Sequence, residues 1–340
     1  MMEPDMSAVE RLIEAQLGTD ATRRLLEVVE IDATIGSGDG EEVTRGEVAM
    51  ALGACLFDGL LHAVPSGAAY VEDRRAEGGK VCFDHGAIRT ILFADGPTGA
   101  LPAGQLAFSR ILEPLGYAVA GLYPLPRLNM TGRAYCHLDH AETVPQYFVS
   151  ELHVDRFDED FGTVAARVFG QSRDPLGSAA RTLLDTLSAT QKAPFAVAAA
   201  GLPELLAAFG RHHDIPTLDD YHALRAASPE AAWIATEGNA FNHATDRVAD
   251  VEALADRQRA LGRPIKDRVE VSANGRVRQT AYRADPVTRS FRTDDGQIEQ
   301  QVPGSFYEFI TRDTDPETGK LDLGFDSGNA TGIFQMTKVA

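Results

Sequence analysis

Two heptapeptides decide the fold: FDHGAIR at residues 83–89 and FNHATDR at residues 241–247. Both fit the pattern F-[DN]-H-x-x-x-R, and each lies in an extended, mostly apolar segment. The last strand-like segment of each surrounding region carries a glutamate among aromatic and aliphatic residues, Glu151 in YFVSEL and Glu308 in FYEFI. Similar motifs at equivalent places in two regions indicate a duplicated module.

The segments around the two heptapeptides follow the same order, strand–helix–strand–strand–strand. The first region has its helix at 101–116 and its three later strands within 117–154. The second has a helix at 250–262, a hairpin at 267–284 with an Asn-Gly turn, and a final strand at 305–313. The sequence therefore predicts an α+β fold in which two βαβββ modules pair into one curved sheet or open barrel.

The rest of the chain reads as helical. Apolar residues recur at helical spacing over 6–31 and 43–63, and the stretch 156–235 is rich in alanine and leucine. We therefore divide the chain into four parts. They are an N-terminal helical segment (1–79), the first module (80–155), a helical insertion (156–235), and the second module with the C-terminal segment (236–340).

Composition excludes several classes of protein. The 340 residues are 44% hydrophobic, enough for a sizeable core, and the net charge of −18 disfavours nucleic acid and anionic lipid as partners. The three cysteines are scattered without a CxxC pair, which argues against a disulfide framework or a zinc ribbon. We find no signal-peptide pattern and no apolar run of ~18 residues, so we expect a cytoplasmic protein with no membrane span.

Four side chains are the candidates for chemistry: His85, Glu151, His243 and Glu308. Strand alternation allows each to point into a cavity shared by the two modules. Two imidazoles and one carboxylate form a facial triad with open positions, which suits a non-haem Fe(II) that binds substrate and oxygen together. We favour Glu308 as the carboxylate and leave Glu151 as the fourth corner. The alternative is that the histidines are hydrogen-bonded core residues and that the buried glutamate pairs with an arginine.

Arg89 follows His85 by four residues, so on a strand it shares the face of the histidine, about 13 Å further along. An arginine that points into a metal cavity suggests a bidentate anchor for a substrate carboxylate. The alternative is an ion pair with Asp84 or another buried acid. Arg283 and Arg312 are further pocket candidates that the sequence does not rank.

The remaining histidines are weaker candidates. His137 and His140 lie in CHLDH (136–140), but on a strand their side chains point to opposite faces. His212 and His213 follow a helix, and we expect them at the surface.

The sequence resembles the 2-oxoadipate dioxygenase/decarboxylase family, whose fold is related to the vicinal-oxygen-chelate fold. The resemblance runs from about residue 80 to the C-terminus. The segments that carry it are FDHGAIRT (83–90), PQYFVSEL (145–152), FNHATDRV (241–248), VPGSFYEFITR (302–312) and NATGIFQ (329–335).

By this resemblance, the metal ligands of the family fall on His85, His243 and Glu308. Its substrate-binding arginine falls on Arg89, and a further substrate contact falls on Asn329, where better-known members have a serine.

The resemblance also implies the reaction. It is an Fe(II)- and O2-dependent oxidative decarboxylation of a small 2-oxo dicarboxylic acid, with 2-oxoadipate giving 2-hydroxyglutarate and CO2 in lysine catabolism. The 1-carboxylate and 2-oxo group of the substrate would chelate the iron, and Arg89 would hold the distal carboxylate. No separate 2-oxoglutarate cosubstrate is needed.

Two other classes of function remain open from the sequence. One is a redox-inert metal enzyme on the same scaffold, a lyase, isomerase or hydrolase that uses Zn(II), Mn(II) or Ni(II), with Glu151 as fourth ligand or general base. The other is a non-catalytic protein that binds a small molecule. The sequence makes no prediction of the oligomeric state.

Overall fold

The structure is a computed structural model that describes residues 6–35 and 40–326. Its longer helices are α1 (Ala8–Leu17), α2 (Thr19–Val28), α3 (Arg45–Ala63), α4 (Pro65–Ala76), α5 (Leu106–Leu112), α6 (Glu159–Phe169), α7 (Ser178–Thr190), α8 (Phe195–Ala207), α9 (Leu218–Ala227), α10 (Pro229–Glu237) and α11 (Val251–Ala260). Its strands are β1 (Glu42–Thr44), β2 (Phe83–Leu92), β3 (Tyr117–Leu125), β4 (Met130–His137), β5 (Gln146–His153), β6 (Lys192–Pro194), β7 (His243–Arg247), β8 (Glu270–Val271), β9 (Val277–Ala281), β10 (Pro286–Thr293), β11 (Gly296–Pro303) and β12 (Phe306–Arg312).

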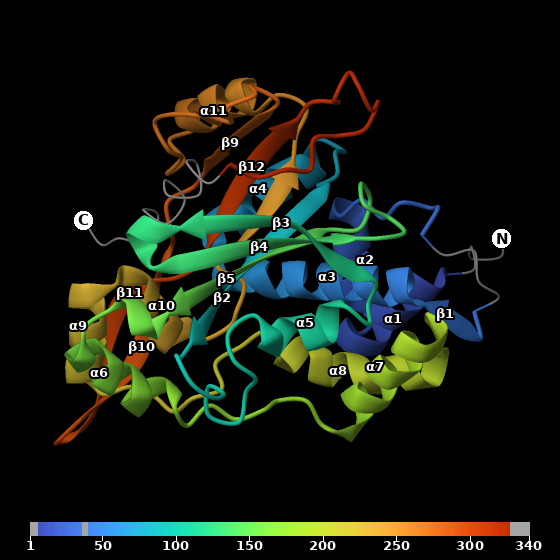
Figure 1. Ribbon diagram of the computed structural model, residues 1–340. Coiled ribbons are helices and arrows are strands. Elements are labelled where there is room, and N and C mark those ends of the chain that lie inside the picture. The colour runs from blue at the N-terminus through green and yellow to red at the C-terminus, as the bar shows by residue number, and fades with distance from the viewer. Residues whose placement is uncertain (1–5, 36–39, 327–340) are drawn as a thin grey trace.

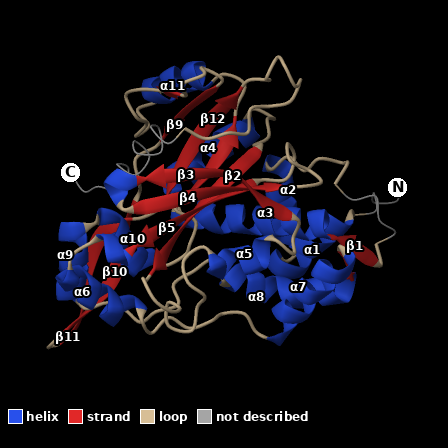
Figure 2. Cartoon of the chain, in the orientation of Figure 1, coloured by secondary structure: helices blue, strands red, loops and turns tan. Residues whose placement is uncertain are grey.

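Eight strands form one curved sheet in the order β3-β4-β5-β2-β7-β12-β9-β8 (Figures 1 and 2). Outward from the central pair β2 and β7, both halves place the four strands of their module in the same order: first, fourth, third and second. In each half, the first strand pairs in parallel with the last strand of its module, β2 with β5 and β7 with β12. The two halves meet where β2 and β7 pair antiparallel. The predicted fold of two paired βαβββ modules is confirmed.

A β-bulge shapes the central pair of strands. Phe83 is opposite Asp246 and His85 is opposite Thr245, which leaves Asp84 as an extra residue in β2. A bulge redirects the side chains around it. It allows Phe83 to pack against Phe57 of α3, with ring centroids 5.2 Å apart, whereas His85 lines a pocket on the other face of the sheet.

The helix α3 covers the face of the sheet opposite that pocket. Its N-terminus is closed by a capping box in which the Thr44 side chain accepts from the Glu47 N–H. Within the described residues, α3 is the one helix long and apolar enough to cross a membrane, but 67% of it is buried inside the molecule. A helix that is apolar on all sides is typical of a protein core.

The segment 156–235 is helical, as predicted, but its helices lie in two places. Helices α7 and α8 pack with α1 and α3, and β6 of the same stretch pairs with β1. Helices α6, α9 and α10 gather at the other end of the molecule (Figure 1). There they lie beside the β10–β11 hairpin, a two-stranded sheet within the second module that we did not predict.

Candidate metal centre and active site

Three buried side chains from three neighbouring strands converge: His85 of β2, His243 of β7 and Glu308 of β12. The two histidines line a pocket. One potential ligand atom from each lies within 4.8 Å of the other two. The Nε2 atoms of both histidines are 3.3 Å from Glu308 Oε2. Thr245, between these residues in the sheet, donates a hydrogen bond of 2.7 Å to the same carboxylate oxygen.

The charge states of two of the three side chains suit a metal ion. Burial alone would raise the pKa of Glu308, but His243 and His85 outweigh it and lower that pKa to about 2. Burial lowers the pKa of His243 to about 3, so that its ring is neutral. A carboxylate anion and a neutral imidazole are the forms that bind metals.

Two buried atoms of this cluster lack hydrogen bonds. Within the described residues, neither Glu308 Oε1 nor His243 Nε2 has a hydrogen-bond partner, and the Glu308 side chain is fully buried. An unpaired buried carboxylate is costly, and a cation at this point would remove that cost. The donor set of two imidazoles and one carboxylate therefore fits a transition metal with open coordination positions.

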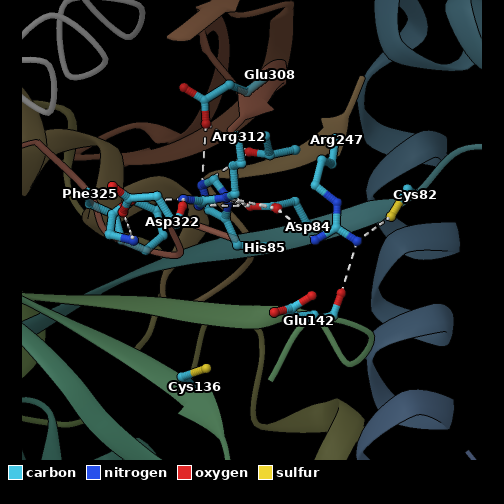
Figure 3. Close-up of polar contacts among 12 residues, drawn as sticks. Cys82, Asp84, His85, Cys136, Glu142, Arg247, Glu308, Arg312, Asp322 and Phe325 are labelled. Atoms are coloured by element: carbon cyan, nitrogen blue, oxygen red, sulfur yellow. Dashed lines mark hydrogen bonds and ion pairs between the residues drawn. The ribbon is translucent and has the colours of Figure 1, made fainter. Parts of the chain in front are cut away.

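His85 is held by a charged chain that reaches across the sheet (Figure 3). Its Nδ1 is 2.8 Å from Asp84 Oδ2, and Arg312 Nη2 donates to that same oxygen over 2.9 Å. Burial lowers the pKa of His85, but the bonds from Asp84 and Glu308 outweigh it and raise that pKa above its ordinary value. A carboxylate on the far nitrogen of a histidine fixes the ring and directs Nε2 toward a metal.

Part of this charged chain of side chains was not predicted from the sequence. Arg312 was one of two unranked candidates, and the structure buries it in the ion pair with Asp84. Arg283, the other candidate, is exposed. Arg247 lies on the side of Asp84 away from Glu308, where its Nη2 donates to Cys82 Sγ and to the Glu142 carbonyl (Figure 3).

Arg89 lines the same pocket as the two histidines and is 1% exposed. Its guanidinium carbon lies 5.0 Å from the ring centroid of Trp233, within the range of a cation–π contact. Burial lowers the pKa of Arg89 to about 10, which still leaves it charged at neutral pH. Asp84, the alternative partner that we considered, is bonded to Arg312 instead.

The remaining walls of the pocket are half apolar and half polar. The residues that line it besides the histidines and Arg89 are Ala87, Ile88, Phe148, Ser150, Asn242, Gln279, Phe325 and Asp326. The ring of Phe325 lies edge-on to His85, with centroids 4.8 Å apart. The predicted substrate contact Asn329 lies outside the described residues.

Glu151 is not part of the pocket, and its prediction as the fourth corner is wrong. It lies opposite Thr90 of β2, whereas Phe148 and Ser150 of the same strand line the pocket. Because side chains alternate along a strand, residue 151 points to the other face. There it accepts from Arg133 over 2.6 Å and from the backbone N–H of Gln105 over 3.1 Å.

The other histidines serve the fold. His137 is buried, and its Nδ1 accepts from the backbone N–H groups of Asp139 and His140, so it organises the turn after β4. His213 is also buried, contrary to expectation, and contacts the Ala235 carbonyl over 3.0 Å. Within the described residues, no second group of three potential ligands converges as His85, His243 and Glu308 do.

Comparison with known proteins identifies the family. Residues 60–317 match the family described as 2-oxoadipate dioxygenase/decarboxylase. The chain is 24% identical over 298 residues to a chloroplastic 2-oxoadipate dioxygenase/decarboxylase of Arabidopsis thaliana, covering 78% of this chain and 70% of that protein.

Two solved structures share the fold. A glyoxalase superfamily protein of Ralstonia eutropha JMP134 has 50% identity and a TM-score of 0.90, over 96% of this chain and 99% of that one. A hydroxyglutarate synthase of Oryza sativa, solved in complex with 2-oxoadipate, has 19% identity and a TM-score of 0.65, over 91% and 95% of the two chains. With the family match covering most of its length, this chain belongs to the 2-oxoadipate dioxygenase/decarboxylase family.

Proposed function

We propose that this protein is a non-haem Fe(II) enzyme that converts 2-oxoadipate and O2 into 2-hydroxyglutarate and CO2. The observation that carries the proposal is the buried cluster of His85, His243 and Glu308, with Arg89 in the same pocket. The family match and the 2-oxoadipate bound to the rice enzyme support the choice of substrate. The proposal extends to a role in lysine catabolism, which the sequence resemblance suggests, and to a cytoplasmic location.

The bound Fe(II) would supply the redox chemistry between oxygen and the 2-oxo acid. His85 Nε2, His243 Nε2 and a Glu308 oxygen would hold the metal. A set of three protein ligands would leave coordination positions for substrate and oxygen. With the metal bound, Asp84 would accept from Nδ1 of the His85 ring, so that Nε2 would present a lone pair. The hydroxyl of Thr245 holds one Glu308 oxygen in place.

The far end of the pocket suits the second carboxylate of the substrate. Arg89 is charged and presents two parallel N–H donors, the geometry that a carboxylate accepts best. Ala87 lies between His85 and Arg89 on the same face of β2, and Phe148 lies beside it, so this part of the pocket suits methylene groups. The pocket therefore has a metal end, an apolar middle and a cationic end, in the order of the groups of a 2-oxo dicarboxylic acid.

The redox-inert alternative loses a residue that it required. Glu151 lies on the other face of the sheet and is bonded to Arg133, so it serves neither as a fourth ligand nor as a general base in this pocket. Within the described residues, Asp326 is the one carboxylate residue that lines the pocket, and Glu308 is fully buried beside the two histidines.

Oxygen consumption tests the proposal. Protein loaded with Fe(II) under anaerobic conditions is mixed with 2-oxoadipate and oxygenated buffer, and O2, CO2 and 2-hydroxyglutarate are measured together. We expect equal amounts of oxygen consumed and of each product formed. Release of CO2 without oxygen uptake and without 2-hydroxyglutarate would indicate a redox-inert decarboxylation, and the absence of any turnover with 2-oxoadipate bound would refute the proposed reaction.

A further inference from the structure

The two modules pair their first and last strands in the same register, and this equivalence defines a fourth corner of the candidate metal site. Strand pairing sets Gln146 beside His85 in the first module and Phe306 beside His243 in the second. Two residues further along β5 and β12 are Phe148 and Glu308. Phe148 is therefore the counterpart of the ligand Glu308, at the place where the duplicated fold would put a fourth ligand.

The neighbours of Glu308 and Phe148 on the adjacent strands differ in the same way as these two residues do: one neighbour is polar and the other is apolar. Glu308 lies beside Thr245, whose hydroxyl donates to its carboxylate. Phe148 lies beside Ala87, which has no polar group, and the two pack in one small apolar cluster. One corner of the site is thus a carboxylate with its hydrogen-bond donor, and the corner related to it by the duplication is apolar throughout.

The Phe148 ring lies away from the histidines. A Cβ atom placed on Gly132 of β4 would overlap the Cζ atom of Phe148, so the ring extends over β4 and not toward β2. Only glycine at position 132 leaves room for this placement. The ring also packs against Phe325, with centroids 5.0 Å apart. The corner that a fourth ligand would occupy is therefore open to the pocket that Phe148 lines.

The open corner lies on the path toward Arg89. In the register of the sheet, Phe148 of β5 lies opposite Ala87 of β2, and Ala87 lies opposite His243 of β7. Ala87 is two residues after His85 and two residues before Arg89 in β2. A ligand that reaches from the metal to Arg89 passes this level. Any metal-binding side chain at position 148 would occupy the coordination position that faces the substrate.

We propose that Phe148 is a specificity-determining residue that keeps the fourth coordination position of the metal open for the 2-oxo acid, with Gly132 holding its ring aside. This inference rests on the proposed function for the identity of the ligand that uses the position. The position itself is defined by the duplicated register alone.

The first test asks whether residue 148 reaches the metal. Phe148→Glu supplies a carboxylate, and Phe148→Gln supplies a side chain of the same size that ligates poorly. Equilibrium dialysis measures the affinity of each variant of the full chain for Co(II), a metal that avoids oxidation during the assay. We expect Phe148→Glu to bind Co(II) about tenfold more tightly than Phe148→Gln. Equal affinities would overturn the inference, because the corner would then lie outside the coordination sphere.

The second test asks whether the substrate uses the open position. Calorimetry measures 2-oxoadipate binding to the Co(II)-loaded wild type, Phe148→Glu and the apolar control Phe148→Leu. We expect Phe148→Leu to bind within a few-fold of wild type and Phe148→Glu to bind at least about tenfold more weakly. Similar binding by both variants would overturn the substrate role. Absence of binding to the wild type would refute the proposed substrate, and the Co(II) comparison would still decide the position.

A third variant tests whether the position of the Phe148 ring matters. Gly132→Ala forces the Phe148 ring back toward the histidines, so we expect unchanged Co(II) affinity and weaker 2-oxoadipate binding. Adding Phe148→Leu to Gly132→Ala removes the ring that clashes, and we expect it to restore 2-oxoadipate binding. Restoration would establish that the ring acts through its position. Undiminished binding by Gly132→Ala alone would overturn the role of the glycine.

Discussion

Replacing Arg312 by methionine tests the charged chain behind the metal site. The Arg312 side chain is fully buried, and the Asp84 side chain beside it is 1% exposed. Its Nε and Nη2 donate to the Asp84 carboxylate over 2.9–3.1 Å, and its Nη1 donates to the carbonyls of Asp322 and Gly324. Methionine keeps much of the volume and removes every one of these donors.

Arg312→Met should lower the free energy of unfolding strongly, because it leaves the Asp84 carboxylate buried without its charged partner. Removing one partner of a buried ion pair leaves an uncompensated charge and costs about 3–5 kcal/mol. A surface pair gives the matched control. Arg278 and Asp313 form a bidentate pair at 2.7 Å, but their side chains are 26% and 46% exposed. Arg278→Met should therefore cost about 1 kcal/mol or less.

Urea denaturation followed by circular dichroism measures both costs. Arg312→Met should lose at least about 2 kcal/mol more than Arg278→Met in the free energy of unfolding. The double variant Asp84→Asn/Arg312→Met should recover part of that loss, because it leaves no charge behind. Equal losses in the two single variants would refute the reasoning, as would a double variant no more stable than Arg312→Met.

Four further outcomes are expected. Asp84→Asn should weaken Fe(II) binding about 10–100-fold in anaerobic dialysis while the fold persists, because His85 loses its charged acceptor. Unchanged affinity would contradict the role of the charged side chains behind His85. Arg89→Ala should retain iron but lose 2-oxoadipate affinity in calorimetry, and wild-type affinity would remove its role as anchor. Glu151→Gln should leave iron content unchanged by metal analysis, since it lies outside the pocket. Burial raises the pKa of Asp246 from 3.8 to about 6, so its ionisation lowers stability as pH rises through that range. In urea titrations, the free energy of unfolding of Asp246→Asn should rise relative to that of wild type by up to about 3 kcal/mol between pH 4 and pH 7. A difference that does not change with pH would contradict this shift.

The fold and the convergence of His85, His243 and Glu308 were predictable because the repeated motifs and the strand periodicity are visible in the sequence. Strand alternation and the repeated heptapeptides fix which residues share a face, and the parallel pairing of the first and last strand of each module brings the faces together.

The misplacement of Glu151 has a simple cause. Matching the two modules on their glutamates pairs Glu151 with Glu308, whereas the register of the sheet pairs Phe148 with Glu308. The two alignments differ by three residues. An odd shift along a strand moves a side chain to the opposite face, so this error carried Glu151 out of the pocket.

The roles of the arginines could not be ranked from the sequence. Arg312 and Asp84 are 228 residues apart in the chain, and only the folded sheet brings them together. The β10–β11 hairpin escaped prediction for another reason. Most of its side chains are exposed or half-buried, and only Phe291 and Val302 are buried, so it shows no continuous apolar face.

The most direct test of the metal site is anomalous diffraction at the iron edge from crystals of the protein loaded with Fe(II) under anaerobic conditions. We predict one strong peak within bonding distance of His85 Nε2, His243 Nε2 and a Glu308 oxygen, with no protein ligand on the side of Phe148. A peak at another group of residues, or no peak here in protein shown to contain iron, would contradict the account.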